Sequence, residues 1–193
     1  MLNNLTPAAR LAYLPAYFRA LLTAATLNGA AISEADGWRS CAVVMPPGAD
    51  VGNPWTLVPA GLVGILWTLG VRGCRKMIGE YEGLTGGAKE REMGKGGRYY
   101  YVFFVGTAEE GRGRGLASRL MEEVQEGAGK EGMPVWLEAT TERSRRVYAR
   151  LGFEDLGEIV LGKGQVGADG EPKKGGEGVR IWPMIWRPDS AKS

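Results

Sequence analysis

A glycine- and arginine-rich turn is the part of the sequence whose residue types and spacing indicate chemistry most directly. Residues 105–118 read VGTAEEGRGRGLAS, so a strand-like run leads into glycines and arginines and then into a helix-like segment. Backbone N–H groups in such a turn lie unpaired at the positive end of the helix dipole, and glycine lets a ligand approach them. Arg112 and Arg114 add positive charge at the same place. The turn is therefore predicted to bind phosphate groups.

Two further side chains suited to proton transfer follow the turn. Glu138 lies near the end of the run PVWLEA, which is typical of a central strand, and Tyr148 lies in a short helical segment over residues 141–151. The chain contains no histidine, which excludes catalytic triads and metal sites that depend on an imidazole. A general acid or base must therefore be Glu, Asp, Tyr, Lys, Cys or water. The two cysteines provide neither a disulfide framework nor a four-ligand metal site.

Both segments resemble signatures of one enzyme family. The spacing Arg112-x-x-Gly115-x-Ala117 resembles the R/Q-x-x-G-x-G/A motif of the GNAT superfamily of N-acetyltransferases, in which this turn holds the pyrophosphate of acetyl-CoA. The pattern Tyr148-x-x-x-Gly152-Phe153 resembles the second signature of the superfamily. The segment MIWRP, residues 184–188, is similar to the closing strand of small-molecule acetyltransferases of the puromycin N-acetyltransferase type. The resemblance covers residues 98–188 and implies acetyl-CoA as cosubstrate, with no metal.

The resemblance also implies roles for individual residues. Backbone N–H groups near Val105 and Thr107 would polarise the thioester carbonyl, and Tyr148 would protonate the leaving thiolate or else pack against CoA. The base does not follow from the resemblance: without histidine it must be a carboxylate or a chain of water molecules, and Glu138, near the end of a central strand, is the leading candidate. The alternative role for Glu138 is that of a structural hydrogen-bond acceptor. The arginines at 143, 145 and 146 would form a solvated face or meet the 3′-phosphate of CoA. The residues implied to bind acetyl-CoA are Val105, Thr107, Arg112, Gly113, Arg114, Gly115, Ala117, Ser118 and Ser144.

The elements that position these residues follow from hydrophobic periodicity and turn signals. We expect helices over 6–29, 56–82, 115–129 and 141–151, and strands over 38–45, 98–107, 134–139, 153–161 and 179–187. Glycine-rich loops are predicted over 83–97 and 162–178. This order predicts an α/β (α+β) fold, in which a mixed central sheet is flanked by helices. The resemblance further implies that the usual first strand and helix of the superfamily are lacking.

Length and composition agree with a single domain over residues 1–193, with 1–97 on the acceptor side and 98–188 as the acetyl-CoA-binding core. The net charge of +2 does not indicate a nucleic-acid partner. The uncharged run 51–71 is nearly long enough to span a bilayer, but its prolines and glycines favour a buried loop and helix. We expect a cytoplasmic protein without a membrane partner, and we leave a homodimer open.

The expected function is therefore acetyl-CoA-dependent N-acetylation of a small-molecule amine by direct attack. The alternatives are a catalytically weak or inactive acyl-CoA-binding or regulatory module of the same fold, and an unrelated nucleotide-binding domain. The P-loop signature that would support the last of these is absent. The sequence does not identify the acceptor amine.

Overall fold

The computed structural model describes residues 7–62 and 71–188. The chain divides into two compact units, each assembled from three segments. The first unit comprises Met1–Asn28, Asp50–Arg91 and Ile159–Arg180, and the second comprises Gly29–Ala49, Glu92–Glu158 and Ile181–Ser193. All the residues predicted to form the site belong to the second unit. That the whole chain forms one domain stays a prediction.

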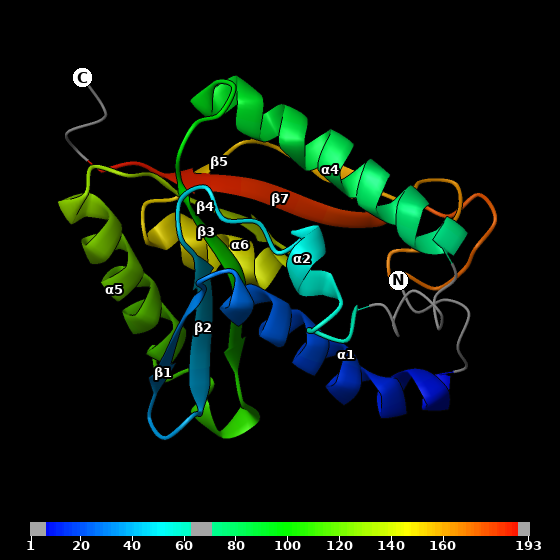
Figure 1. Cartoon of the computed structure of the whole chain (residues 1–193), viewed down its shortest axis with the longest axis horizontal. Helices are drawn as coiled ribbons and strands as arrows, with labels where there is room; N and C mark the ends of the chain where they lie inside the picture. Colours follow the sequence, from blue (N-terminus) through cyan, green and yellow to red (C-terminus); the bar gives the residue numbers. More distant parts are fainter. Residues whose placement is uncertain (1–6, 63–70, 189–193) are drawn as a thin grey trace. The chain divides into compact units, whose positions relative to one another are not determined.

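The first unit is mainly helical. It holds α1 (Pro7–Leu27), α2 (Pro54–Leu57) and most of α4 (Val71–Met93), labelled as in Figure 1. Asn28 follows the end of α1, and its side-chain amide donates hydrogen bonds to the Ala24 carbonyl at 2.8 Å and to Thr56 Oγ1 at 2.7 Å. The helix predicted over residues 6–29 is confirmed for Pro7–Leu27, and Asn28 and Gly29 form the turn that ends it.

Helix α4 corrects the predicted loop over residues 83–97. The helix continues through three glycines of that segment and ends only at Met93. Glycine disfavours a helix interior by about 1 kcal/mol, which is why the composition predicted a loop. Here Thr85 and Ala88 are almost completely buried, and the Thr85 hydroxyl donates to the Tyr81 carbonyl at 2.7 Å. Burial of this helical face outweighs the low propensity of the glycines.

The second unit is built on a mixed sheet, as the sequence predicted. Its strands are β1 (Ala31–Ala35), β2 (Ser40–Met45), β3 (Tyr100–Thr107), β4 (Val135–Ala139), β5 (Glu154–Asp155) and most of β7 (Val179–Trp186). Strand β6 (Ile159–Leu161) belongs to the first unit. Their order is β1-β2-β3-β4-β7-β5, and β6 also pairs with β7. The β3–β4 pair is parallel, whereas β1–β2, β2–β3, β4–β7 and β5–β7 are antiparallel.

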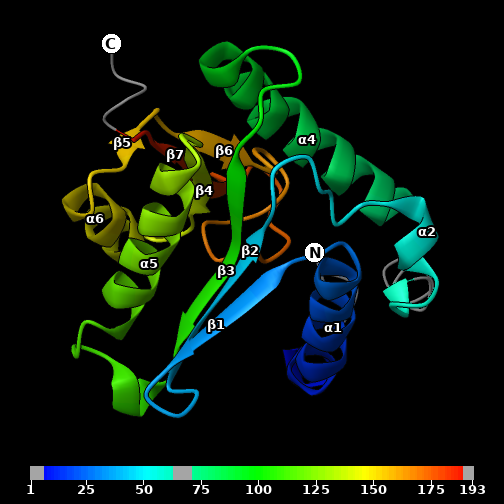
Figure 2. The same ribbon diagram turned by 60° about the vertical axis from the view of Figure 1, so that its left-hand side comes forward.

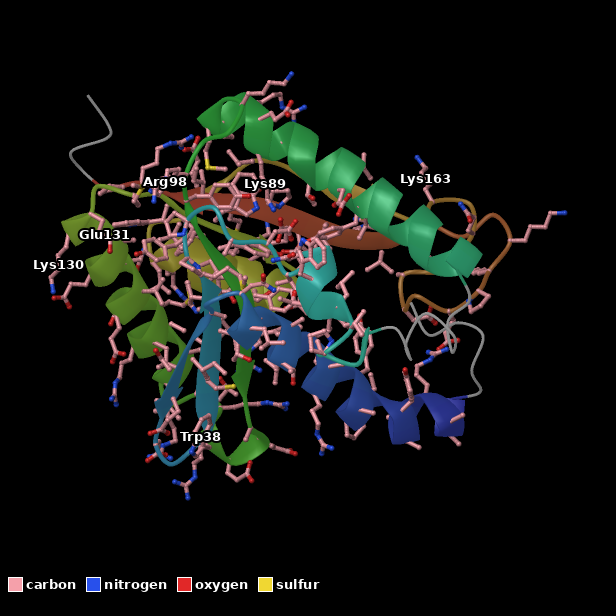
Figure 3. The ribbon with its side chains drawn as sticks, viewed as in Figure 1. Trp38, Lys89, Arg98, Lys130, Glu131 and Lys163 are labelled. Carbon is pink, nitrogen blue, oxygen red and sulfur yellow. The ribbon has the colours of Figure 1, made fainter. Side chains whose placement is uncertain are left out.

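Two predicted strands differ from the observed ones. The strand predicted over 38–45 begins only at Ser40, because Trp38 adopts a left-handed φ of 67° in the turn of a hairpin whose first strand, β1, was missed. Figure 3 shows Trp38 at the tip of this hairpin. The strand predicted over 153–161 is divided into β5 and β6, because Leu156 leaves the ladder after donating to the Pro183 carbonyl at 3.1 Å.

Helices α5 (Leu116–Lys130) and α6 (Glu142–Arg150) complete the second unit. Helix α5 packs on β1, β2, β3 and β4, and α6 packs on β4 and β5 (Figure 2). Met121 and Ala128 of α5 meet Leu137 and Ala139 of β4 in a fully buried cluster. Apolar burial of this kind fixes the two helices on one face of the sheet, so their N-terminal ends are held at set positions.

No helix within residues 7–62 and 71–188 is long and apolar enough to cross a membrane. Residues 63–70, within the uncharged run 51–71, lie outside the described part of the chain.

Candidate active site

The site begins at an edge of β3 that has no strand partner in the described chain. Strand β2 pairs with β3 along its whole length, from Thr107 to Tyr101. Strand β4 pairs with β3 at only two positions, Tyr100↔Val135 and Tyr101↔Trp136. The remainder of β3 therefore presents backbone hydrogen-bonding groups that no neighbouring strand satisfies. An extended ligand with amide groups can add to such an edge.

A β-bulge decides which N–H groups face this open edge. Ala108 N donates to the Arg39 carbonyl at 2.8 Å, so the N–H of Ala108 points toward the β1–β2 hairpin. Because hydrogen-bonding direction alternates along a strand, the N–H groups of Val105 and Thr107 point to the open edge.

The bulge is needed for this outcome. At the other end of β3, Tyr100 N donates to the Pro134 carbonyl at 2.9 Å, on the β4 side. Unbroken alternation from Tyr100 would turn the N–H groups of Val105 and Thr107 toward β2. The register shift at Val43/Val44 leaves Phe103 as an extra residue without a partner on β2. Beyond this bulge, each N–H group of β3 therefore points to the side opposite to that expected from unbroken alternation.

The turn after β3 is shaped by glycine. Gly113 and Gly115 have left-handed φ values of 78° and 73°, and Gly115 is the N-cap of α5 with no side-chain cap. The first N–H groups of α5 are therefore left for a ligand. A Cβ atom added at either glycine would meet nothing within 4 Å, so the space beside the turn is open. At Gly111, in contrast, an added Cβ would lie 3.1 Å from the Arg39 carbonyl oxygen, which fixes the turn against the hairpin.

The open edge, the turn and helix α6 surround one cavity of about 790 Å³. Strand β3, the turn and the start of α5 contribute Val105, Thr107, Gly111, Arg112, Gly113, Gly115, Leu116, Ala117 and Ser118. The segment of α6 contributes Thr141, Arg143, Ser144, Arg146, Val147, Tyr148 and Arg150. The lining thus contains four arginines and no acidic residue. Such a surface favours a ligand that carries several negative charges.

Helix α6 is fixed at its N-terminus by a reciprocal cap. The Thr141 hydroxyl accepts from Ser144 N at 3.0 Å, and the Ser144 hydroxyl accepts from Thr141 N at 3.2 Å. The Ser144 hydroxyl, predicted to contact the cofactor, therefore serves the helix itself while it borders the cavity.

Tyr148 lies between the cavity and the core. Its ring packs against Phe153, with ring centroids 5.8 Å apart, and burial raises the pKa of its hydroxyl to about 12. The phenol is therefore protonated at neutral pH, so toward a ligand anion in the cavity it acts as a hydrogen-bond donor.

Comparison with known proteins agrees with this geometry. Residues 64–153 match the profile of the Acetyltransferase (GNAT) family. This segment, close to half of the chain, is a GNAT acetyltransferase segment by its sequence. The crystal structure of a histone acetyltransferase HPA2 and related acetyltransferase from Corynebacterium glutamicum is similar to the chain, with a TM-score of 0.58 and 21% identity over 98% of this chain and 81% of that one. At that identity the likeness concerns the fold.

Two sequence relatives of the chain come from yeasts. Increased recombination centers protein 11 of Saccharomyces cerevisiae is 30% identical over 53% of this chain and 66% of its own length. An uncharacterized N-acetyltransferase of Schizosaccharomyces pombe is 21% identical over 63% of this chain and 50% of its own length. The chain thus spans about half to two thirds of the length of these relatives.

Two residues that the sequence assigned to the GNAT site lie outside the cavity lining. Arg114 pairs with Asp36 of the β1–β2 hairpin, and its role in binding the cofactor stays a prediction. Glu138 accepts hydrogen bonds from Tyr101 Oη at 2.9 Å and from Trp136 Nε1 at 2.7 Å. Its strand neighbours Leu137 and Ala139 pack in the cluster with α5, so alternation places Glu138 on the opposite face of β4. Its role as the base also stays a prediction.

The arginines of α6 were only partly anticipated. Arg143 and Arg146 border the cavity, whereas Arg145 pairs with Asp155 and Glu142 and lies over the Trp182 ring, 5.2 Å from its centroid. Sequence reasoning missed Arg150. Its spacing of i+4 from Arg146 and i+7 from Arg143 was the signal available, because residues so spaced share one helix face.

In residues 7–62 and 71–188, no group of three or more His, Cys, Asp or Glu side chains is placed to hold a metal ion.

Proposed function

We propose that the protein transfers an acetyl group from acetyl-CoA to the amine of a small molecule. The observation that carries this proposal is the single cavity in which a glycine turn, four arginines and the open edge of β3 meet. Its volume of about 790 Å³ lies within the range of cofactor sites.

The residues present fit acetyl-CoA. The turn from Arg112 to Ser118, with its uncapped helix N-terminus and open glycine positions, suits the pyrophosphate. The backbone groups of Val105 and Thr107 at the open edge suit the amides of the pantetheine arm. Acetyl-CoA would supply the acetyl group as a reactive thioester.

The chain itself supplies donors and a base. The N–H groups of Val105 and Thr107 donate toward a carbonyl oxygen held at the open edge, and the protonated Tyr148 donates toward a sulfur atom. Glu138 would take the proton of an amine that approaches from the face of β4 opposite α5. The two hydrogen bonds from Tyr101 and Trp136 hold the Glu138 carboxylate in one position for that role.

The class of acceptor rests on two kinds of support. The Schizosaccharomyces pombe relative is called an N-acetyltransferase, which supports an amine. The similarity of the closing segment MIWRP to small-molecule acetyltransferases supports a small substrate. A cytoplasmic location and a homodimeric state stay predictions.

A second candidate function is an acyl-CoA-binding module without turnover. Two observations favour it: the cavity lining has no carboxylate, and both oxygens of Glu138 already accept hydrogen bonds. In that case the cavity would bind CoA, but no base would be available to deprotonate an amine.

A thiol-release assay separates the two functions. The purified protein is incubated with acetyl-CoA and a panel of polyamines, aryl amines, aminoglycosides and peptide amines, and CoA binding is measured in parallel by calorimetry. We expect release of CoA that depends on one class of amine. CoA binding without turnover across the panel would favour the module, and absence of both would contradict the proposed function.

A further inference from the structure

Helix α6 presents a row of three arginines to the cavity. Arg143, Arg146 and Arg150 all belong to the lining, and their spacing places them on one helix face. Among the described residues, none of the three takes part in an ion pair or a side-chain hydrogen bond. The carboxylates of Asp155 and Glu142 bind Arg145 instead. The three cavity arginines therefore keep their charge available to a ligand.

The three arginines add more positive charge than is needed to bind one pyrophosphate at the turn. The turn already offers Arg112, the glycine N–H groups and the N-terminus of α5. Like charges at spacings of three and four residues destabilise a helix, and α6 carries such pairs from Arg143 to Arg146 and from Arg146 to Arg150. An anion bound between them would offset that repulsion.

We propose that Arg143, Arg146 and Arg150 form a second phosphate subsite, which binds the 3′-phosphate of CoA and makes the protein select CoA over dephospho-CoA. The proposal rests on the proposed function, in which the turn takes the pyrophosphate. The ribose 3′-phosphate is the remaining anionic group of CoA, and as a monoester it carries a charge of about −1.5 to −2 at pH 7. The planar guanidinium matches the geometry of phosphate oxygens.

The test measures the affinity of the full chain for CoA and for dephospho-CoA by isothermal titration calorimetry. We expect the wild-type protein to bind CoA at least about tenfold more tightly, as one or two charge-assisted contacts would give. In Arg143→Gln/Arg146→Gln/Arg150→Gln the two affinities should become nearly equal, through loss of affinity for CoA alone. If the triple variant folds poorly, the three single variants are measured instead. Each should lose part of the preference for CoA over dephospho-CoA.

Two further variants show where each arginine acts. Arg112→Gln should weaken CoA and dephospho-CoA by the same factor, because both ligands carry the pyrophosphate. Arg119→Gln removes an equal charge from an exposed position of α5 outside the lining, and should leave the ratio of affinities unchanged.

Two outcomes overturn the subsite alone: equal binding of both ligands by the wild-type protein, or an equal loss of both in the triple variant. In either case the proposed function stands, because CoA still binds. Failure of both ligands to bind the wild-type protein would overturn the proposed function and the subsite together.

Discussion

At the scale of single residues, the raised pKa of Tyr148 defines what this side chain can do. Burial raises the pKa of the hydroxyl to about 12, so the protonated form persists well above pH 10, where an ordinary tyrosine is half ionised. Full proton transfer to a thiolate with a pKa near 8.5 would be uphill by about 3.5 pKa units. We therefore expect Tyr148 to stabilise a leaving sulfur by donating a hydrogen bond.

Replacing Tyr148 by phenylalanine removes this donor and keeps the ring against Phe153. We expect kcat to fall by about 10- to 100-fold, while KM for acetyl-CoA changes less than about twofold. Steady-state thiol release measures both. In the wild-type protein, ionisation of Tyr148 should cause no decline in kcat between pH 8 and 10. Tyr100→Phe is the control, because the Tyr100 hydroxyl donates to Glu131 outside the cavity lining. An unchanged kcat in Tyr148→Phe would remove the hydroxyl from the reaction.

The Glu138→Gln variant tests the role of Glu138 as a base while it retains the hydrogen bonds around this side chain. The glutamine oxygen can still accept from Trp136 Nε1, and its amide can donate to Tyr101 if that hydroxyl rotates, so the melting temperature should change little. We expect kcat to fall by about 100-fold, since an amide cannot accept the proton of an amine. Full activity in a folded Glu138→Gln protein would make Glu138 a structural acceptor only.

At the scale of elements, the two ends of α5 offer a matched pair of glycines. Gly115 at its start and Gly132 beyond its end have left-handed φ values of 73° and 65°, and an added Cβ meets nothing within 4 Å at either. Alanine at each position should therefore cost a similar strain of about 1–2 kcal/mol. Only Gly115→Ala should lose CoA affinity, by about tenfold or more, because only Gly115 borders the cavity. Thermal melts and calorimetry of the two variants check this, and equal CoA binding would place the phosphates away from the turn.

The strand and helix that carry the glycine turn could be predicted because local signals agree there. The run YYVFFV is apolar on both faces, and the glycines mark the following turn. Strand β1 was missed because most of its residues are exposed, so hydrophobic periodicity does not mark it. The Asp36-Gly37 pair in the following turn, where both residues take left-handed conformations, was the hairpin signal available in the sequence. The predicted helix ended before residue 83, too early for α4, because glycine has a low helix propensity. In the structure, packing maintains the helix through these glycines.

The site was predictable to the extent that it is local in sequence. The turn and Tyr148 belong to short motifs, and both border the cavity. The direction in which the N–H groups of β3 point was not predictable, because it depends on the pairing with β2 that creates the bulge at Phe103. The hydrogen-bond partners of Glu138 could not be predicted either, since Tyr101 lies 37 residues away in the sequence, on another strand.

At the scale of the whole molecule, overall charge conceals a strong local field. The chain has a net charge of only +2, because acidic and basic residues are nearly equal in number. The cavity lining, in contrast, has four arginines and no acidic residue, all within the second compact unit. Attraction of an anionic ligand should therefore come from the cavity rather than from the net charge of the protein.

This distribution of charge predicts that the affinity for CoA depends on salt through the arginines of the cavity. Raising NaCl from about 0.1 M to about 1 M shortens the screening length from about 10 Å to about 3 Å, so CoA affinity should fall on the order of tenfold. Calorimetry at the two salt concentrations, in a buffer without phosphate or sulfate, measures the change. The triple variant Arg143→Gln/Arg146→Gln/Arg150→Gln should show a shallower dependence, because fewer charges remain to be screened, whereas Arg119→Gln should match the wild type. If CoA affinity were independent of salt, the phosphates would not lie among the cavity arginines, since charge pairs bordering an open cavity must weaken as the screening length shortens.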